Sequence, residues 1–160
     1  MRVLAVLILV AFTVAGSESS RLTISGPATV IDGDTIIVDR THIRLFGVDA
    51  PESDQRCKDA KAQSYNCGML AADVLQEEIG GANVVCFPID TDQYRRTVAI
   101  CIARGRDLAR VMVERGWAVD YEAFSGGFYG WSEREARAAK RGLWAGEFQQ
   151  PREWRREKRR

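Results

Sequence analysis

Residues 43–52 read IRLFGVDAPE and contain the most informative pattern in the chain. The first half has the alternation of a β-strand, and Arg44 shares a face with His42 and Phe46 on that strand. An arginine that points inward is costly unless an anion faces it. The second half places Asp49 and Glu52 just after the strand. The stretch therefore predicts a strand whose buried arginine needs an acidic or phosphate partner.

The rest of the chain predicts a mixture of strands and helices. Strand-like runs occur at residues 22–31, 35–39, 42–48, 83–89 and 96–103. Helical spacing occurs at residues 69–79, 107–116 and 132–142, with Asp107 as a cap of the second helix and Ser132 and Glu135 as a capping box of the third. The order predicts an α+β fold, a five-stranded OB-fold β-barrel with three packed helices.

The first twenty residues have the pattern of a secretory signal peptide. Met1-Arg2 is followed by the apolar run Val3 to Val14 and by the small residues at 15–17. Twelve residues are too few to span a bilayer core of about 30 Å, although a buried strand or an uncleaved anchor are alternatives. We therefore expect a signal peptide at residues 1–20, one domain at residues 21–150, no transmembrane span in the mature chain, and a secreted or periplasmic protein.

Four cysteines lie in the predicted domain, and export permits disulfide bonds. Position along the chain favours Cys57 with Cys67 and Cys86 with Cys101. In an antiparallel hairpin of the last two strands, the midpoint between 86 and 101 falls in the connecting loop, so the second pair would face each other. Zinc is the less favoured use, because the chain has no Cys-x-x-Cys and one histidine.

Acidic side chains gather at two turns of the strand region. Asp32 and Asp34 flank a glycine in the first turn, and Asp49 and Glu52 follow the third strand. A meander can bring Asp34 and Asp49 together with a backbone carbonyl, and such oxygens are the ligands of hard cations. The alternative is that aspartate and glycine simply form turns. Spacing alone leaves both interpretations open.

Arg44 and Arg96 are the two basic residues that could face this acidic region. A guanidinium grips phosphate oxygens in a bidentate way, so two of them opposite a cation would form a phosphate clamp. The alternative is a pair of structural ion pairs with nearby aspartates. The residues themselves do not separate the two possibilities.

Three segments together resemble the staphylococcal nuclease (thermonuclease) family: VIDGDT at 30–35, IRLFGVDAPE at 43–52 and DQYRR at 92–96. The resemblance extends from about Ala28 to Trp144. It implies an OB-fold nuclease that uses Ca²⁺ to hydrolyse phosphodiester bonds of DNA and RNA with little sequence specificity. It implies no stable protein partner, and we expect a monomer.

The resemblance also implies residue roles. Asp34 and Asp49 would be carboxylate ligands of Ca²⁺, with the carbonyl of Ala50, where family members often have threonine, as a further ligand. Glu52 would position and deprotonate the attacking water. Catalysis would also need Arg44 and Arg96 on the phosphate, and substrate binding would use Tyr94 and Tyr121 beside the nucleotide; ordinary barrel packing is the alternative for both tyrosines.

One position departs from the family pattern. Arg95 stands where many members have glycine, and a glycine there would suit a turn with positive φ. Its absence could shift the loop that carries Arg96.

The formal charge of +1 hides two opposite parts. The tail at 152–160 has six basic and two acidic residues, whereas residues 21–151 have 16 basic and 19 acidic residues. We expect residues 151–160 to form a basic, disordered tail that either attracts nucleic-acid phosphates or is only solvated. An alternative function for the whole chain is a non-catalytic OB-fold module that binds single-stranded nucleic acid. An interaction domain with incidental acidic turns is a third.

Overall fold

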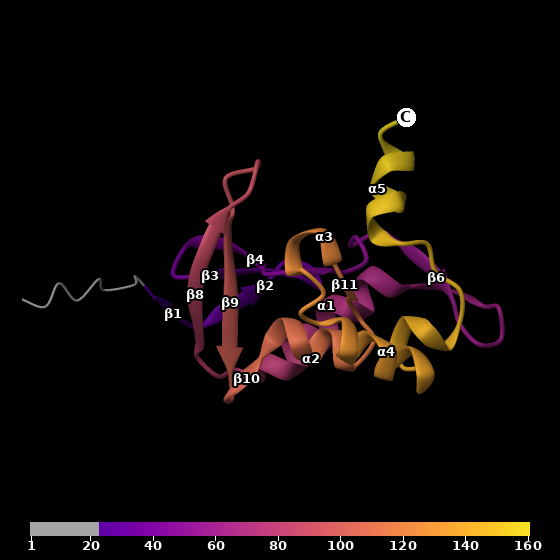
Figure 1. Cartoon of the computed structure of the whole chain (residues 1–160), viewed down its shortest axis with the longest axis horizontal. Helices are drawn as coiled ribbons and strands as arrows, with labels where there is room; N and C mark the ends of the chain where they lie inside the picture. The colour runs from indigo at the N-terminus through magenta and orange to yellow at the C-terminus, as the bar shows by residue number, and fades with distance from the viewer. Residues whose placement is uncertain (1–22) are drawn as a thin grey trace, which may run out of the picture.

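The computed structural model describes residues 23–160 (Figure 1), so the predicted signal peptide lies outside the described residues. The strands are β1 (Ile24–Gly26), β2 (Ala28–Val30), β3 (Thr35–Val38), β4 (Thr41–Leu45), β5 (Val48–Asp49), β6 (Arg56–Lys58), β7 (Ser64–Asn66), β8 (Val84–Thr91), β9 (Thr97–Ala103), β10 (Arg106–Asp107) and β11 (Val119–Asp120). The helices are α1 (Cys67–Ile79), α2 (Leu108–Glu114), α3 (Glu122–Ser125), α4 (Gly130–Ala138) and α5 (Pro151–Lys158), with a 3-10 turn at Gly142–Ala145.

The main sheet has the strand order β1-β8-β9-β4-β3-β2, with β10 paired to β9. The pairing of β4 with β9 is parallel and the others are antiparallel. Figure 1 shows this sheet curling on itself, with α1, α2 and α4 on one side. One apolar core joins the inner face of the sheet to those helices, and its members include Ile36, Ile43, Leu75 and Met112. The predicted α+β barrel class is confirmed, but the main sheet has seven strands instead of five and the described residues form five α-helices instead of three.

Two predicted strands are each divided in the structure. The run at 22–31 breaks at Pro27, which has no N–H to donate, so β1 pairs with β8 while β2 pairs with β3. The run at 42–48 breaks at Gly47, whose φ is +70°, and this lets β5 leave the main sheet and pair with β11. The break sends Asp49 back beside the end of β4.

The predicted start of the third helix, with Ser132 as its cap, is wrong. Helix α4 begins at Gly130, and Ser132 is buried inside it rather than capping it. The cause is Tyr129, which is fully buried and whose hydroxyl donates to Asp107 at 2.9 Å, fixing the chain just before the helix. Asp107 itself caps α2 as predicted, accepting from the backbone of Ala109 and Arg110.

The C-terminal segment was predicted to be disordered, and this is wrong. Residues 151–158 form α5, with a proline at its start and ion pairs from Arg155 to Asp49 at the end of β5 and from Lys158 to Asp54 after it. A helix too short and too polar to be stable alone is held by these contacts with acidic side chains. The segment is therefore part of the folded domain.

Both predicted disulfides form. Cys86 and Cys101 are directly opposed in the β8–β9 hairpin and lie in the barrel core. Cys57 and Cys67 join β6 to the first residue of α1, and together with Leu143 they form a second, smaller apolar cluster. In residues 23–160 no helix is both long enough and apolar enough to cross a membrane.

Candidate active site

The β3–β4 pair places Arg44 beside Asp34. Thr35 and Arg44 are opposed in the register, and the N–H of Leu45 donates to the carbonyl of Asp34 at 2.8 Å. The tight turn before β3 is closed by Asp32, whose carboxylate accepts from the N–H of Asp34 at 3.0 Å. Glycine is needed at position 33, because a Cβ there would lie 2.7 Å from the Cβ of Ala50. The turn and the segment after β5 are therefore packed against each other.

Arg44 links two buried carboxylates. Its Nη1 donates to Oδ1 of Asp34 at 2.5 Å, and its Nη2 donates to Oδ1 of Asp49 at 2.8 Å. The aspartate side chains are each 3% exposed and that of Arg44 is 16% exposed. The sequence expectation that Arg44 points inward and meets an anion is met by these two aspartates. In this structure Arg44 forms structural ion pairs with the two aspartates, which is the alternative to a phosphate clamp.

Burial raises the pKa of Asp34 to about 7, and the neighbouring Arg44 acts against that shift. The nearby Asp32 and Asp49 raise it further, while the Ala50 N–H, which donates to Oδ2 of Asp34 at 2.8 Å, lowers it. The pKa of Arg44 lies above its usual value: burial acts to lower it, but the two aspartates outweigh that effect. Burial is thus the main cause of the raised pKa of Asp34, and the neighbouring carboxylates add to it.

Helix α5 supplies a residue that the sequence interpretation missed. Arg155 donates through Nη1 to Oδ1 of Asp49 at 2.8 Å and through Nη2 to Oδ2 of Asp49 at 2.9 Å. The same Nη1 donates to Oε1 of Glu52 at 2.8 Å. The only signal in the sequence was the basic excess of the tail, which does not indicate which arginine reaches the site.

Glu52 lies at the edge of the site, with its side chain 35% exposed. Its backbone is fixed by Gln55, since the two residues exchange hydrogen bonds: Glu52 N–H donates to Oε1 of Gln55 at 3.2 Å, and Gln55 N–H donates to the Glu52 carbonyl at 2.8 Å. Gly68 of α1 allows the close approach, because a Cβ at that position would collide with the Glu52 carbonyl. The carboxylate is thus held on a rigid turn but open to solvent.

The tip of the β8–β9 hairpin carries Arg96. Its Nε and Nη2 contact Oδ2 of Asp92 at 2.8 Å and 2.7 Å, and its Nη1 donates to the hydroxyl of Thr35 at 3.4 Å. The Thr35 hydroxyl in turn donates to Oδ1 of Asp34 at 3.1 Å. Arg96 therefore reaches the carboxylates through one intervening side chain. Its pair with Asp92 matches the structural ion pair that the sequence left open as the alternative to a phosphate clamp.

The hairpin tip adopts the conformation that the family's glycine would favour. Arg95 has a φ of +65°, and its N–H donates to the carbonyl of Asp92 at 2.9 Å. The carboxylate of Asp92 also accepts from the N–H groups of Tyr94 and Arg96, each at 2.9 Å. The turn is thus formed with arginine in place of glycine, and it presents Arg96 toward Thr35.

The two predicted substrate-binding tyrosines are differently placed. Tyr94 is 62% exposed, and the Arg96 guanidinium lies 5.5 Å from its ring centroid. Tyr121 donates its N–H to the carbonyl of Gly47 at 2.9 Å, and the Arg152 guanidinium of α5 lies 6.0 Å from its ring. Tyr94 therefore adjoins Arg96 at the hairpin tip, whereas Tyr121 lies beside Gly47 and Arg152 of α5.

The donor set has the chemistry of a hard-cation site. Asp34, Asp49 and Glu52 supply oxygen ligands, and Arg44 offsets one of their charges from a fixed position on β4. Within residues 23–160, no three or more acidic, histidine or cysteine side chains are already gathered to hold a metal ion. The carboxylates are gathered around two guanidiniums instead. A divalent cation fits the charge of the site on condition that Arg155 gives way.

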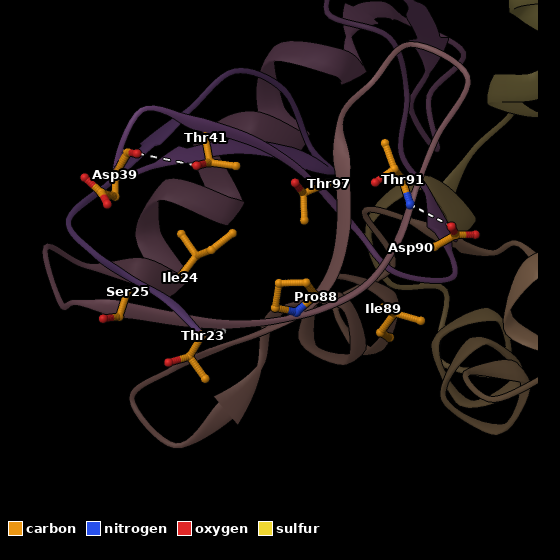
Figure 2. A pocket seen from close by; sticks show the side chains of 10 residues that line it. All are labelled: Thr23, Ile24, Ser25, Asp39, Thr41, Pro88, Ile89, Asp90, Thr91 and Thr97. Atoms are coloured by element: carbon orange, nitrogen blue, oxygen red, sulfur yellow. Dashed lines mark hydrogen bonds between the residues drawn. The ribbon is translucent and has the colours of Figure 1, made fainter. Parts of the chain in front are cut away.

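The larger of the two described cavities lies elsewhere. An open hollow of about 760 Å³ lies between β1, the β3–β4 turn and the β8–β9 hairpin, and Figure 2 shows threonine, isoleucine, serine and proline side chains in its lining together with Asp39 and Asp90. None of the predicted site residues lines it. Its acidic, arginine-free lining does not suit a phosphate.

Comparison with protein families gives one match over most of the chain. A family model described as "Staphylococcal nuclease homologue" matches residues 42–146. The match includes all the predicted site residues except Asp34, and it ends before α5.

Three individual proteins similar to this chain carry different names. Succinoglycan biosynthesis protein ExoI of Rhizobium meliloti (strain 1021) is 36% identical over 123 residues, covering 76% of this chain and 64% of that protein. Probable endonuclease LCL3 of Schizophyllum commune is 36% identical over 121 residues, covering 65% and 40%. Probable staphylococcal-like nuclease CAN1 of Oryza sativa subsp. japonica is 32% identical over 130 residues, covering 79% and 36%. The matched region is less than two thirds of each relative's length.

Proposed function

Because the chain belongs to the staphylococcal nuclease family, we propose that it is a Ca²⁺-dependent nuclease that hydrolyses phosphodiester bonds of DNA and RNA with little sequence preference. The observation that carries the proposal is the meeting of Asp34, Arg44, Asp49 and Glu52 at one end of the barrel. Two relatives carry nuclease or endonuclease in their names, which supports the same reaction class.

Asp34, Asp49 and the carbonyl of Ala50 would hold the cation in this proposal. When bound, Ca²⁺ would supply positive charge next to the phosphate oxygens and so favour attack on an otherwise repelling anion. The two aspartates are suited to this role because their side chains are nearly inaccessible to solvent. The Arg44 guanidinium contacts both carboxylates and so fixes their spacing.

Glu52 would accept a proton from the attacking water. The water oxygen then bonds to phosphorus, the bond from phosphorus to one ester oxygen breaks, and the leaving oxygen takes a proton from solvent water while Glu52 releases its proton to solvent. The partial exposure of Glu52 supports this role, since the carboxylate is open to water while its backbone is fixed by Gln55. Glu52 and Asp49 share the short segment after β4, and Asp34 lies in the turn before β3.

Arg44 and Arg96 would bind the phosphate and stabilise the charge that grows on it in the transition state. Each donates at present to an aspartate, and a phosphate would become an additional partner for the guanidinium N–H groups. Loss of one such donor typically slows a reaction by about 100-fold to 1,000-fold. Tyr94 and Tyr121 would stack on bases, at about 1 to 3 kcal/mol each.

The proposal includes export. Residues 1–20 would be removed as a signal peptide, and the mature monomer would work outside the cytoplasm or in a periplasm. The two disulfides support this location, because such bonds persist in oxidising compartments. Sequencing the amino terminus of the protein recovered from an exported fraction tests it: a mature chain that still begins at Met1 contradicts the signal peptide.

The activity is tested by incubating the oxidised chain with supercoiled plasmid DNA and with RNA, in Ca²⁺ or in chelator. Glu52→Gln is compared with Glu135→Gln, an exposed glutamate of α4 that removes the same charge away from the site. We expect cleavage in Ca²⁺ by the parent chain and by Glu135→Gln, and a rate about 100-fold to 1,000-fold lower for Glu52→Gln. Intact nucleic acid in Ca²⁺ contradicts the nuclease, and a gel shift without cleavage supports the binding module instead.

A further inference from the structure

Helix α5 lies directly over the candidate active site. The chain before it is fastened to the body at two points: Lys58 and Glu147 exchange backbone hydrogen bonds at 2.8 Å and 3.0 Å, and Nε2 of Gln55 donates to the carbonyl of Gln149 at 2.8 Å. Figure 1 shows α5 rising beside β6, clear of the barrel. These contacts bring the base of the helix next to the turn that carries Glu52.

The helix is held at its base by Pro151 and the half-buried Trp154, and further along by ion pairs. Of its residues only Pro151 is buried. Arg155 contacts Asp49 and Glu52, and Lys158 pairs with Asp54 on the same acidic segment. A cavity of about 180 Å³ remains between the helix and this segment. Beyond its first turn, α5 is joined to the body by these ion pairs, so the docking of that part of the helix depends on the negative charge beneath it.

Arg155 takes up the coordination capacity that a metal would need. Oδ1 of Asp49 already accepts from Arg44 and Arg155, and Oδ2 accepts from Arg155. Oε1 of Glu52 also accepts a hydrogen bond from the Arg155 guanidinium. A cation bound to Asp49 would lie next to a guanidinium of like charge, in a site whose aspartate side chain is 3% exposed. The two cannot both be close to Asp49.

We propose that Arg155 competes with Ca²⁺ for Asp49 and Glu52, so that α5 closes the active site when the cation is absent and swings away when the cation binds. The proposal rests on the metal site of the proposed function. The contacts of Gln149 and Glu147 lie outside the helix, so they hold the hinge while the helix moves. Cation binding and docking of α5 are then coupled with opposite sign, and each weakens the other.

Calorimetric titration of Ca²⁺ into the full oxidised chain tests the competition. Arg155→Gln removes the competing charge, and Arg156→Gln removes the same charge from an exposed neighbour on the same helix. We expect Arg155→Gln to bind Ca²⁺ about ten-fold more tightly than the parent chain, a usual size for such coupling, and Arg156→Gln to bind within about two-fold of it. Equal or weaker binding by Arg155→Gln overturns the proposal.

Arg155→Lys separates charge from geometry. It keeps the positive charge but loses the planar fork that spans both oxygens of Asp49. We expect its Ca²⁺ affinity to lie between those of the parent chain and Arg155→Gln. An affinity for Arg155→Lys above that of Arg155→Gln overturns the competition. Far-ultraviolet circular dichroism of each variant checks that the barrel is intact.

Limited trypsin digestion follows the helix itself. Helix α5 contains several arginine and lysine residues, and release from the acidic segment exposes their peptide bonds to the protease. In the parent chain we expect Ca²⁺ to speed cleavage within residues 152–159, with the barrel still intact. In Arg155→Gln that cleavage is expected to be fast with or without Ca²⁺. Ca²⁺ that leaves cleavage unchanged or slows it in the parent chain overturns the movement of α5.

The readouts keep this proposal apart from the nuclease activity. Tighter Ca²⁺ binding and faster tail cleavage without any cleavage of nucleic acid would support the role of Arg155 and contradict the nuclease. Cleavage of nucleic acid with identical Ca²⁺ affinities in the parent chain and Arg155→Gln would support the nuclease and overturn the role of Arg155.

Discussion

Two arginines donate to the same oxygen of Asp49, one from the barrel and one from the C-terminal helix. Arg44 stands on β4 between Ile43 and Leu45, which are buried in the core. Arg155 stands on α5, 106 residues away in sequence, on a helix with a single buried residue. Both donate to Oδ1 of Asp49 at 2.8 Å. The two hydrogen bonds to Asp49 therefore have the same length, although one arginine is on a core strand and the other is on a peripheral helix.

The difference shows that how easily an ion pair can be broken depends on the strand or helix that carries the arginine. Strand β4 cannot withdraw Arg44 without disrupting the barrel, so Asp34 and Asp49 always have that partner. Helix α5 can leave with Arg155 without moving a strand, although it then gives up the pair with Asp49, whose side chain is 3% exposed, and the more exposed pairs with Glu52 and Asp54. The barrel thus fixes one positive charge, and the helix supplies one that another cation can replace.

The largest difference is expected in stability. Arg44→Gln leaves two buried carboxylates short of their main partner, so it should lower the free energy of unfolding by about 3 to 5 kcal/mol. Arg155→Gln leaves Asp49 paired with Arg44 and should cost less, about 1.5 to 3 kcal/mol, because it removes charged hydrogen bonds to a buried carboxylate that keeps its other partner. Urea unfolding in chelator, followed by circular dichroism, measures both. Similar losses of unfolding free energy in Arg44→Gln and Arg155→Gln would contradict the distinction between the two arginines. Arg156→Gln serves as the control.

Removal of either disulfide should lower the free energy of unfolding by about 3 kcal/mol, because each closes a loop of 10 or 15 residues. The effects on α5 should differ. Cys57 belongs to β6, which fastens the chain before α5, whereas Cys86 and Cys101 lie in the barrel. Replacing Cys57 and Cys67 by alanine should speed trypsin cleavage of α5 in chelator. Equal cleavage in the Cys86 and Cys101 double variant would break this assignment.

Gln55→Ala tests the tether more locally. Gln55 is fully buried, and its side chain serves both the Gln149 carbonyl and the Glu52 N–H. Its loss leaves buried polar groups without partners and should cost about 1 to 3 kcal/mol. We also expect faster trypsin cleavage of α5, with the Cys86–Cys101 hairpin unaffected in hydrogen exchange. Unchanged protection of α5 would show that Arg155 and Lys158 hold the helix without the tether.

The smallest effect is expected at the hairpin tip, remote from α5. Arg95 has a φ of +65°, which a side chain disfavours, so Arg95→Gly should raise the free energy of unfolding by about 1 kcal/mol. Thermal unfolding measures the gain. A loss of stability would mean that the Arg95 side chain makes a contribution larger than the backbone strain.

The sequence predicted the barrel side of the comparison better than the helix side. Alternation along β4 indicated that Arg44 points inward, and hairpin geometry indicated the Cys86–Cys101 pair, because both depend on neighbours within one or two strands. Arg155 could not be found in this way. Its partners are more than 100 residues away, and six basic residues in a short polar tail give no local pattern that selects one.

Other errors also arose where distant contacts override local rules. Ser132 and Glu135 form a good capping pattern, but Tyr129 is fixed by Asp107, and the helix begins earlier. Residues 151–158 have the composition of a disordered tail, but the acidic segment at 49–54 provides partners for them. Charge in the fold, rather than helix propensity, decides the structure of α5.

The central claim is that Asp49 is shared between a permanent cation, Arg44, and a replaceable one. The thermal unfolding midpoint of the oxidised chain, measured in chelator and in saturating Ca²⁺, tests it most directly when Asp49→Asn is measured alongside. Since a ligand that binds only the folded state stabilises it, we predict that Ca²⁺ raises the midpoint of the parent chain and leaves that of Asp49→Asn unchanged. A parent chain whose midpoint is the same in Ca²⁺ and chelator, or an equal rise in Asp49→Asn, would contradict it.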